Sequence, residues 1–307
     1  MKKSLVNFVT ITLAFFLLNA CNNSDNSEKQ SENKKPQTEG IGFAVTNETA
    51  LSVYNAVISK LNANSNISII AEVNHSANAQ NADLELNFTR TVYFGNPALG
   101  TPIMNENMQA GLDLPQRITV YTDEDDDTIV CYNSVEYLAD RHNLETAPTL
   151  NTVASALSNI VNSATDEEVT LNNANFDVSG IISITSNNDF ETTYNNIIST
   201  LNTNENISIF AELDHQANAQ SVNMDLLPSK LIIFGNPVLG TPLMQASRTM
   251  ALDLPQKILV YQNNEGEVHI IYNEPFYLAG RHDINSEDEA LSNISQALQN
   301  IANSGSM

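Results

Sequence analysis

The stretch YFGNPALGTPIM at positions 93–104 is repeated 140 residues further along the chain as IFGNPVLGTPLM at positions 233–244. Extended outward from this stretch, residues 40–144 align with residues 180–284 without a gap, and 46 of the 105 aligned positions are identical. A period this long is typical of a duplicated globular domain, because solenoid repeats are much shorter. The 307-residue chain is therefore predicted to contain one domain twice.

The ends of the two copies are indicated by a second match. After a one-residue insertion, LNTVASALSNIVNS at 150–163 aligns with LSNISQALQNIANS at 291–304. We therefore expect the first domain at 40–163, a polar and acidic linker at 164–175, and the second domain at 176–304.

Apolar residues follow helix and strand patterns within each copy. Leu51, Tyr54, Ile58 and Leu61 have the three-to-four spacing of an amphipathic helix. Short apolar segments predict five strands, at 41–45, 67–73, 91–94, 117–121 and 128–132, with counterparts 140 residues later. Further helices are expected after residue 97, at 136–142 and at 150–163. Because helices and strands do not alternate as in parallel sheets, we expect an α+β fold with a small antiparallel sheet and helices on one face.

The N-terminus has the features of an export signal. Two lysines precede an apolar run at 5–18, which is shorter than the roughly 20 residues that span a bilayer. The run ends in Leu-Asn-Ala-Cys21, which resembles the bacterial lipoprotein signal. The resemblance implies a signal peptide at 1–20, lipid on Cys21 and an envelope location, the outer membrane or periplasmic face in a Gram-negative cell. An ordinary secretory signal with a chance cysteine is the alternative. Polar residues at 21–39 predict a flexible tether.

Charge and composition exclude several classes of function. With 36 acidic and 13 basic residues the formal net charge is −23, which argues against nucleic acid as a partner. The GNP segment lacks both a Walker lysine and a GxGxxG pattern, so nucleotide binding has no support. Two cysteines cannot form a cysteine-based zinc site, and Cys131, within an apolar segment, is expected to be a buried small side chain. We expect no cofactor and no metal.

Four blocks are shared by the two copies in the same order. They are AEVNHSANAQ with AELDHQANAQ, YFGNPALGTPIM with IFGNPVLGTPLM, LDLPQRITVY with LDLPQKILVY, and YLADRH with YLAGRH. This combination resembles the domain of unknown function 302 family. The resemblance implies a small α+β fold akin to that of TATA-binding proteins and a tendency to pair about a twofold axis. A tandem copy could supply that pair within one chain. No activity is implied.

Histidine is rare in this chain, yet four of its five histidines fall at equivalent positions of the two copies. His75 and His215 each follow a predicted strand, three residues after Glu72 and Glu212. We expect each histidine and glutamate to approach one pocket mouth. The histidine could act there as a proton carrier or metal ligand. It could equally hydrogen-bond the end of the strand.

The second pair, His142 and His282, follows Arg141 and Arg281. Three interpretations are open for Arg141. Its charge could stabilise the C-terminus of the short helix, it could form a buried ion pair with Asp113, or it could clamp an anionic ligand.

Asn96 and Asn236 belong to the GNP segments. In these segments we expect Thr101 to cap the following helix and Pro102 to lie in its first turn. Capping is favoured over anion binding at this helix N-terminus.

These residues support three hypotheses of function. The leading one is a lipid-anchored envelope protein, without a recognisable catalytic constellation, that binds a small ligand or an envelope protein partner. A competing one is a hydrolase or redox-related enzyme with His75 or His215 as general base and Arg141 or Arg281 as electrostatic stabiliser. It requires His75 and Arg141 to face a common pocket. The third is a structural module in which the shared motifs serve only packing. The candidate ligand-binding residues are Glu72, His75, Asn96, Arg141, His142, Glu212, His215, Asn236, Arg281 and His282.

Overall fold

The computed structural model describes residues 35–176 and 180–307. The predicted signal peptide, the predicted lipidation site Cys21 and most of the predicted tether lie outside the described residues. Within the described part of the chain, no helix is long and apolar enough to cross a membrane.

The first repeat contains the predicted strands and helices in the predicted order. Its elements are β1 (Ile41–Thr46), α2 (Ala50–Asn62), β2 (Ser68–Asn74), α3 (His75–Asn81), β3 (Thr89–Gly95), α4 (Pro97–Glu106), the 3-10 helix η1 (Met108–Leu112), β4 (Gln116–Thr122), β5 (Thr128–Asn133), α5 (Val135–His142) and α6 (Leu150–Thr165).

The second repeat has the same series of elements. They are β7 (Ile181–Ser186), α7 (Phe190–Asn202), β8 (Ser208–Asp214), α8 (His215–Ser221), β9 (Ser229–Gly235), α9 (Pro237–Ala246), the 3-10 helix η2 (Arg248–Leu252), β10 (Gln256–Gln262), β11 (Val268–Asn273), α10 (Pro275–Arg281) and α11 (Asp288–Ser306).

Each repeat forms one antiparallel sheet. The strand order is β2-β3-β4-β5-β1-β6 in the first sheet, where β6 is the two-residue strand Thr170–Leu171, and β8-β9-β10-β11-β7 in the second. The register is equivalent in the two sheets, since Ile118 pairs with Tyr132 and Ile258 pairs with Tyr272. The α+β prediction, with two tandem antiparallel-sheet domains, is confirmed.

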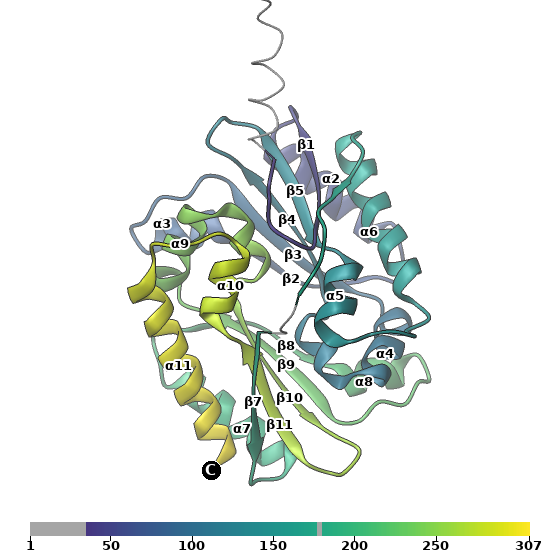
Figure 1. Cartoon of the computed structure of the whole chain (residues 1–307), viewed down its shortest axis with the longest axis vertical. Coiled ribbons are helices and arrows are strands. Elements are labelled where there is room, and N and C mark those ends of the chain that lie inside the picture. The colour runs from purple at the N-terminus through teal and green to yellow at the C-terminus, as the bar shows by residue number, and fades with distance from the viewer. Residues whose placement is uncertain (1–34, 177–179) are drawn as a thin grey trace, which may run out of the picture. The chain divides into compact units, whose positions relative to one another are not determined.

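One face of each sheet packs on helices of its own repeat. Helices α2 and α6 lie along the first sheet, and α7 and α11 lie along the second (Figure 1). They bury apolar side chains such as Val57 and Leu157 in the first core, and Ile197 and Leu298 in the second. Tyr54 and Leu61 of the predicted apolar stripe are buried, because a stripe exposed to water would forfeit the free energy of its burial. Leu51, at the start of the predicted stripe, is instead 50% exposed.

The opposite faces of the two sheets contribute to a shared core. Val73 and Tyr93 of the first repeat pack in one cluster with Leu231, Leu259 and Ile271 of the second. The Tyr93 hydroxyl donates a hydrogen bond across this core to the Leu254 carbonyl at 3.0 Å. These strand residues of the two sheets are therefore buried between the repeats.

Helix α4 begins a turn earlier than expected. Asn96 is the N-cap, its side chain accepting from the Ala98 amide at 3.0 Å, and Pro97 opens the helix. The prediction that Thr101 caps this helix is wrong, and Pro102 lies inside the helix. The Asn96 side chain satisfies a free amide at the N-terminus of the helix, and the ring of Pro97 fixes φ near its helical value. The helix can therefore begin about one turn before Thr101.

Helix α3 was not predicted from the Ala/Asn-rich composition of its segment. Asn74 caps it by accepting from the Ala77 amide at 3.1 Å. His75 therefore begins a helix, and this decides where its ring lies.

The boundaries of the predicted tether and linker also differ in part. Thr38, in the predicted tether, is buried and hydrogen-bonds Thr249 at 2.7 Å. In the predicted linker, α6 continues to Thr165 and the two-residue strand β6 (Thr170–Leu171) pairs with β1. The asparagine side chain of Asn172 donates to the Pro36 carbonyl at 2.8 Å.

Candidate functional site

A central polar cluster lies between the two repeats. It contains, from each repeat, one aspartate, one arginine or lysine from β4 or β10, and the Arg-His pair near the C-terminal end of α5 or α10. Its members are Asp113, Arg117, Arg141, His142, Asp253, Lys257, Arg281 and His282.

Asp113 is held by both repeats. Its Oδ2 accepts from Arg141 and from His142, each at 2.9 Å. Its Oδ1 accepts from Arg117 at 3.1 Å and from Lys257 of the second repeat at 3.2 Å. The carboxylate thus accepts four hydrogen bonds while it is almost wholly buried.

Asp253 has the equivalent environment. Its Oδ2 accepts from Arg281 at 2.6 Å and from His282 at 2.9 Å. Its Oδ1 accepts from Arg117 of the first repeat at 2.7 Å, and Arg117 also donates to the Leu252 carbonyl. Lys257 with Asp113 and Arg117 with Asp253 are therefore reciprocal bridges between the repeats.

A second reciprocal exchange surrounds these bridges. Arg141 donates to Asn273 Oδ1 at 2.7 Å, and Arg281 donates to Asn133 Oδ1 at 2.8 Å. Both asparagines end the last strand of the opposite repeat's hairpin. Each repeat thus makes to the other the same contact that it receives, which is the pattern of a pseudo-twofold axis between the repeats.

Burial and charge together fix the ionisation of the cluster. Burial alone would raise the pKa of Asp113, but Arg141 and Lys257 hold it well below its ordinary value. Burial lowers the pKa of His142, so its imidazole is neutral and donates from Nε2. Burial, helped by Arg117, lowers the pKa of Lys257 to about 8.

The cluster is not open to a ligand. The side chain of Arg141 is 0% exposed and that of Arg281 is 1% exposed. Arg141 forms the buried ion pair with Asp113 that was one of its three interpretations. A guanidinium already occupied by a buried carboxylate has no accessible fork for an anion, so the geometry supports a structural role in joining the repeats.

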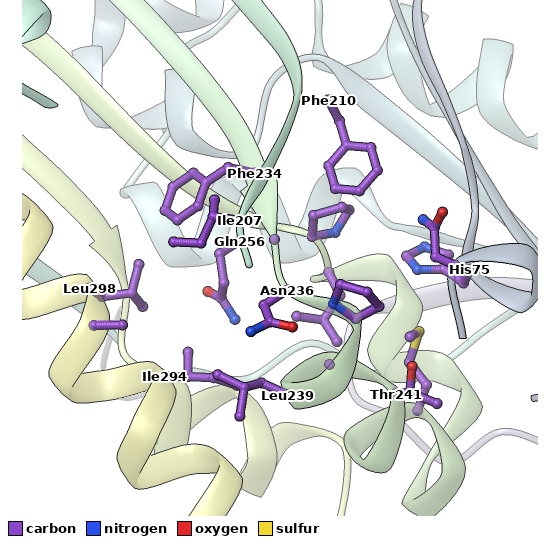
Figure 2. A pocket seen from close by; sticks show the side chains of 18 of the residues that line it. His75, Ile207, Phe210, Phe234, Asn236, Leu239, Thr241, Gln256, Ile294 and Leu298 are labelled. Carbon is purple, nitrogen blue, oxygen red and sulfur yellow. The ribbon is translucent and has the colours of Figure 1, made fainter. Parts of the chain in front are cut away.

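Two pockets, one built mainly by each repeat, are lined by none of the residues of this cluster. The second-repeat pocket has a volume of about 110 Å³. It is lined by apolar side chains of β9, α9 and α11, among them Phe234, Leu239 and Leu298, together with Asn236, Gln256 and Pro255. Figure 2 shows Gln256, Asn236 and Leu239 gathered around one space, with Ile294 and Leu298 beside them.

The other repeat completes this pocket. His75, the first residue of α3, lines it together with Asn78. In Figure 2 His75 lies on the side away from α11. A pocket of the second repeat is therefore closed by a helix of the first.

The first-repeat pocket has the reciprocal construction and a volume of about 150 Å³. Phe94, Leu99 and Leu157 line it with Asn96 and Gln116, and His215 completes it from α8 of the second repeat. The predicted residues His75 and Asn236 thus share one pocket, and His215 and Asn96 share the other.

Both pocket histidines are neutral. Burial lowers the pKa of His75 to about 3 and that of His215 to about 4. His215 Nε2 lies 3.2 Å from the Gly111 carbonyl, which can only accept, so its proton is on Nε2. His75 Nε2 lies 3.2 Å from the hydroxyl of Thr91, which itself donates to the Ala251 carbonyl of the second repeat at 3.2 Å.

The glutamates are placed elsewhere. Glu72 accepts from the Tyr54 hydroxyl at 2.9 Å, and Glu212 accepts from the Tyr194 hydroxyl at 2.5 Å. Neither glutamate lines the two pockets. The expectation that each would share a pocket mouth with its neighbouring histidine is wrong for this geometry.

The predicted set is therefore divided among three kinds of place, which are the central polar cluster, the two pockets and the tyrosine–glutamate pairs. Arg141 and His142 lie in the central polar cluster, and His75 lies in the second-repeat pocket. The common pocket that the catalytic hypothesis requires for His75 and Arg141 is not formed by these residues. No group of three or more His, Cys, Asp or Glu side chains in the described ranges is arranged to hold a metal ion.

Sequence reasoning missed two kinds of residue. Arg117 and Lys257 bridge the repeats, yet they differ between the copies and so drop out of a search for identical positions. Gln116 and Gln256 line the pockets. They could have been found from the sequence, because each ends the LDLPQ block that is identical in the two repeats. In each block the aspartate joins the cluster while the next three residues line the pocket.

Comparison with known proteins places these features in a family. The sequence profile described as "Domain of unknown function DUF302" matches residues 43–164 and 182–301. A solved structure titled as an uncharacterized conserved protein DUF302 from Bacillus stearothermophilus is 18% identical, with a TM-score of 0.37. The similarity covers 41% of this chain and 97% of that chain.

Curated relatives match over a shorter stretch. Proteins named "Fluoride-specific ion channel FluC 1" from Brucella suis biovar 1 (strain 1330) and Brucella abortus biovar 1 (strain 9-941) are 43% identical over 86 residues. That stretch is 28% of this chain and 34% and 32% of the two relatives. The chain thus spans about a third of the length of these curated relatives.

Proposed function

Because the chain belongs to the DUF302 family, whose description assigns no activity, we propose its function from the geometry of the two pockets that the repeats complete for each other. The protein binds small, uncharged and largely apolar molecules, one in each pocket, and is held at the bacterial cell envelope by a lipid on Cys21.

The observation that carries the proposal is the reciprocal construction of the pockets. Each is closed by a helix of the opposite repeat, and neither contains an Asp, Glu, Lys or Arg among its described lining residues. Apolar walls with a few amide groups are typical of small-molecule sites. The first-repeat pocket, at about 150 Å³, has the size of an apolar cavity that accepts benzene, and the second-repeat pocket is somewhat smaller, at about 110 Å³.

The central polar cluster supports this function indirectly. It joins the repeats through Arg117 with Asp253 and Lys257 with Asp113, so it keeps α3 and α8 over the pockets that they complete. A ligand in either pocket contacts both repeats and therefore stabilises their pairing by mass action.

Fluorobenzene tests ligand binding. We expect saturating fluorobenzene to raise the melting temperature of the protein, because it binds only the folded state. Ala156 and Ala297 occupy equivalent pocket positions on α6 and α11. Ala156→Phe and Ala297→Phe should each fill one pocket and reduce the shift, and the double variant should lose it. A shift that survives in the double variant, or is absent in the wild type, would contradict the proposal.

The anchor is tested separately in a bacterial host. Wild-type protein should incorporate radiolabelled palmitate and sediment with membranes, whereas Cys21→Ser should do neither. Wild-type protein that sediments with membranes but incorporates no label would overturn lipid anchoring and leave the pocket proposal untouched.

A further inference from the structure

The second-repeat pocket contains polar atoms without partners. Gln256 is 6% exposed and Thr241 is 0% exposed. The amide Nε2 and Oε1 of Gln256 and the hydroxyl of Thr241 have no hydrogen-bond partner. A buried donor or acceptor without a partner is destabilising, so an unpaired amide that lines a pocket indicates a ligand group that satisfies it.

The first-repeat pocket provides the comparison within the same chain. Its equivalent residues Gln116 and Thr101 have no such buried unpaired atoms, and Gln116 is only half-buried. The difference is confined to the polar side of otherwise similar walls. Among the described lining residues of the two pockets, Gln256 is therefore the glutamine whose amide is both buried and unpaired, whereas the half-buried Gln116 is open to water.

The unpaired atoms also specify the chemistry of that group. A carboxamide side chain offers a donor and an acceptor side by side, so its complement carries an acceptor and a donor with the same spacing. A charged ligand is disfavoured, because no described acidic or basic side chain lines the pocket and His75 is neutral.

We propose that the second-repeat pocket selects uncharged molecules with a ring-sized apolar body and a primary carboxamide or lactam group, which pairs with both polar atoms of Gln256. The proposed apolar body packs against Phe234, Leu239 and Leu298. Its amide group reaches Gln256, which lies beside Asn236 in Figure 2. This inference rests on the proposed function and names the ligand class of one of its two sites.

Three probes of nearly equal size test the inference. Benzamide donates and accepts, acetophenone only accepts, and benzoate is charged. We expect calorimetric titration of the full-length chain to show one site that binds benzamide about tenfold more tightly than acetophenone, with benzoate the weakest. Fluorobenzene serves as the probe without a polar group.

Matched variants assign the selectivity to its residue. Gln256→Leu should abolish the preference for benzamide over acetophenone while fluorobenzene still binds. Gln116→Leu, the same change in the other pocket, should leave the preference unchanged. Gln256→Met provides a second variant if Gln256→Leu folds poorly. The comparison of benzamide with acetophenone on the wild-type protein does not depend on the folding of any variant.

The outcomes separate this inference from the function on which it rests. Equal affinity for benzamide and acetophenone in the wild type, or a preference that persists in Gln256→Leu, would overturn the inference while fluorobenzene binding upheld the pockets. Failure of all four probes to bind would overturn both.

Discussion

The substitution Asp253→Asn tests whether the central polar cluster holds the two repeats together. Asp253 accepts from Arg117 at 2.7 Å, Arg281 at 2.6 Å and His282 at 2.9 Å, and is fully buried. Asparagine preserves the shape but removes the charge and turns one acceptor into a donor. Removal of one partner from a buried ion pair costs about 3–5 kcal/mol, because the remaining charges stay buried.

The expected loss can be measured by thermal and urea unfolding. In a domain of roughly this size, 1 kcal/mol corresponds to about 2–4 °C, so the melting temperature should fall by roughly 6–20 °C. Glu265→Gln is the matched control, because it removes one acidic charge from the exposed tip of the β10–β11 hairpin and should change the melting temperature little. A melting temperature for Asp253→Asn equal to that of Glu265→Gln would refute this account of the cluster.

The remaining predictions concern protonation and access. Burial lowers the pKa of His75 to about 3 and of His215 to about 4, so each contributes stability that is complete above pH 6.5 and is lost as the pH falls toward those values. The loss should reach about 2 kcal/mol per histidine at pH 5. The double variant His75→Gln with His215→Gln should therefore lose less stability between pH 7 and 5 in urea unfolding than the wild type, and an unchanged slope would contradict this account. Burial lowers the pKa of Lys257 to about 8, so the unfolded state binds its proton more tightly and stability should rise between about pH 8 and 10.5 by at most about 3 kcal/mol. Lys257→Met should lack this rise, and a rise identical to that of the wild type would show that another group causes it. Burial also raises the pKa of the Cys131 thiol, so in a Cys21→Ser background iodoacetamide should label Cys131 only after unfolding, and rapid labelling of the native protein would contradict its burial.

Much of the fold could be predicted because the chain presents each pattern twice. Apolar spacing at Tyr54 and Leu61 recurs at Tyr194 and Leu201, and all four side chains are buried on helices that cover their sheets. Helix α3 escaped prediction because Asn74, its N-cap, is one of many asparagines and its segment has few apolar side chains to show a period.

The candidate site could be predicted only in its residue types. Glu72 and His75 are three residues apart, but the chain passes from a strand to a helix between them. Glu72 therefore meets Tyr54 on the helical side of its own sheet, whereas His75 reaches the pocket of the other repeat. Sequence spacing within one repeat carries no information on contacts that form only when two repeats pair.

The role of Arg141 could not be decided from the sequence either. Its pair with Asp113 was among the interpretations because both lie in shared blocks, but its bond to Asn273 crosses between repeats. An arginine that is 0% exposed and one that clamps a ligand have the same sequence signal. Only the structure distinguishes them, through the carboxylate that already occupies the guanidinium.

The most direct test of the central claim is a crystal structure of the protein soaked with bromobenzene. The account predicts anomalous bromine density in two places. One lies among Phe234, Leu239 and Leu298, and the other among the equivalent residues Phe94, Leu99 and Leu157. Crystals that take up bromobenzene elsewhere, or not at all, while both pockets remain empty would contradict the claim that this protein binds small apolar molecules between its repeats.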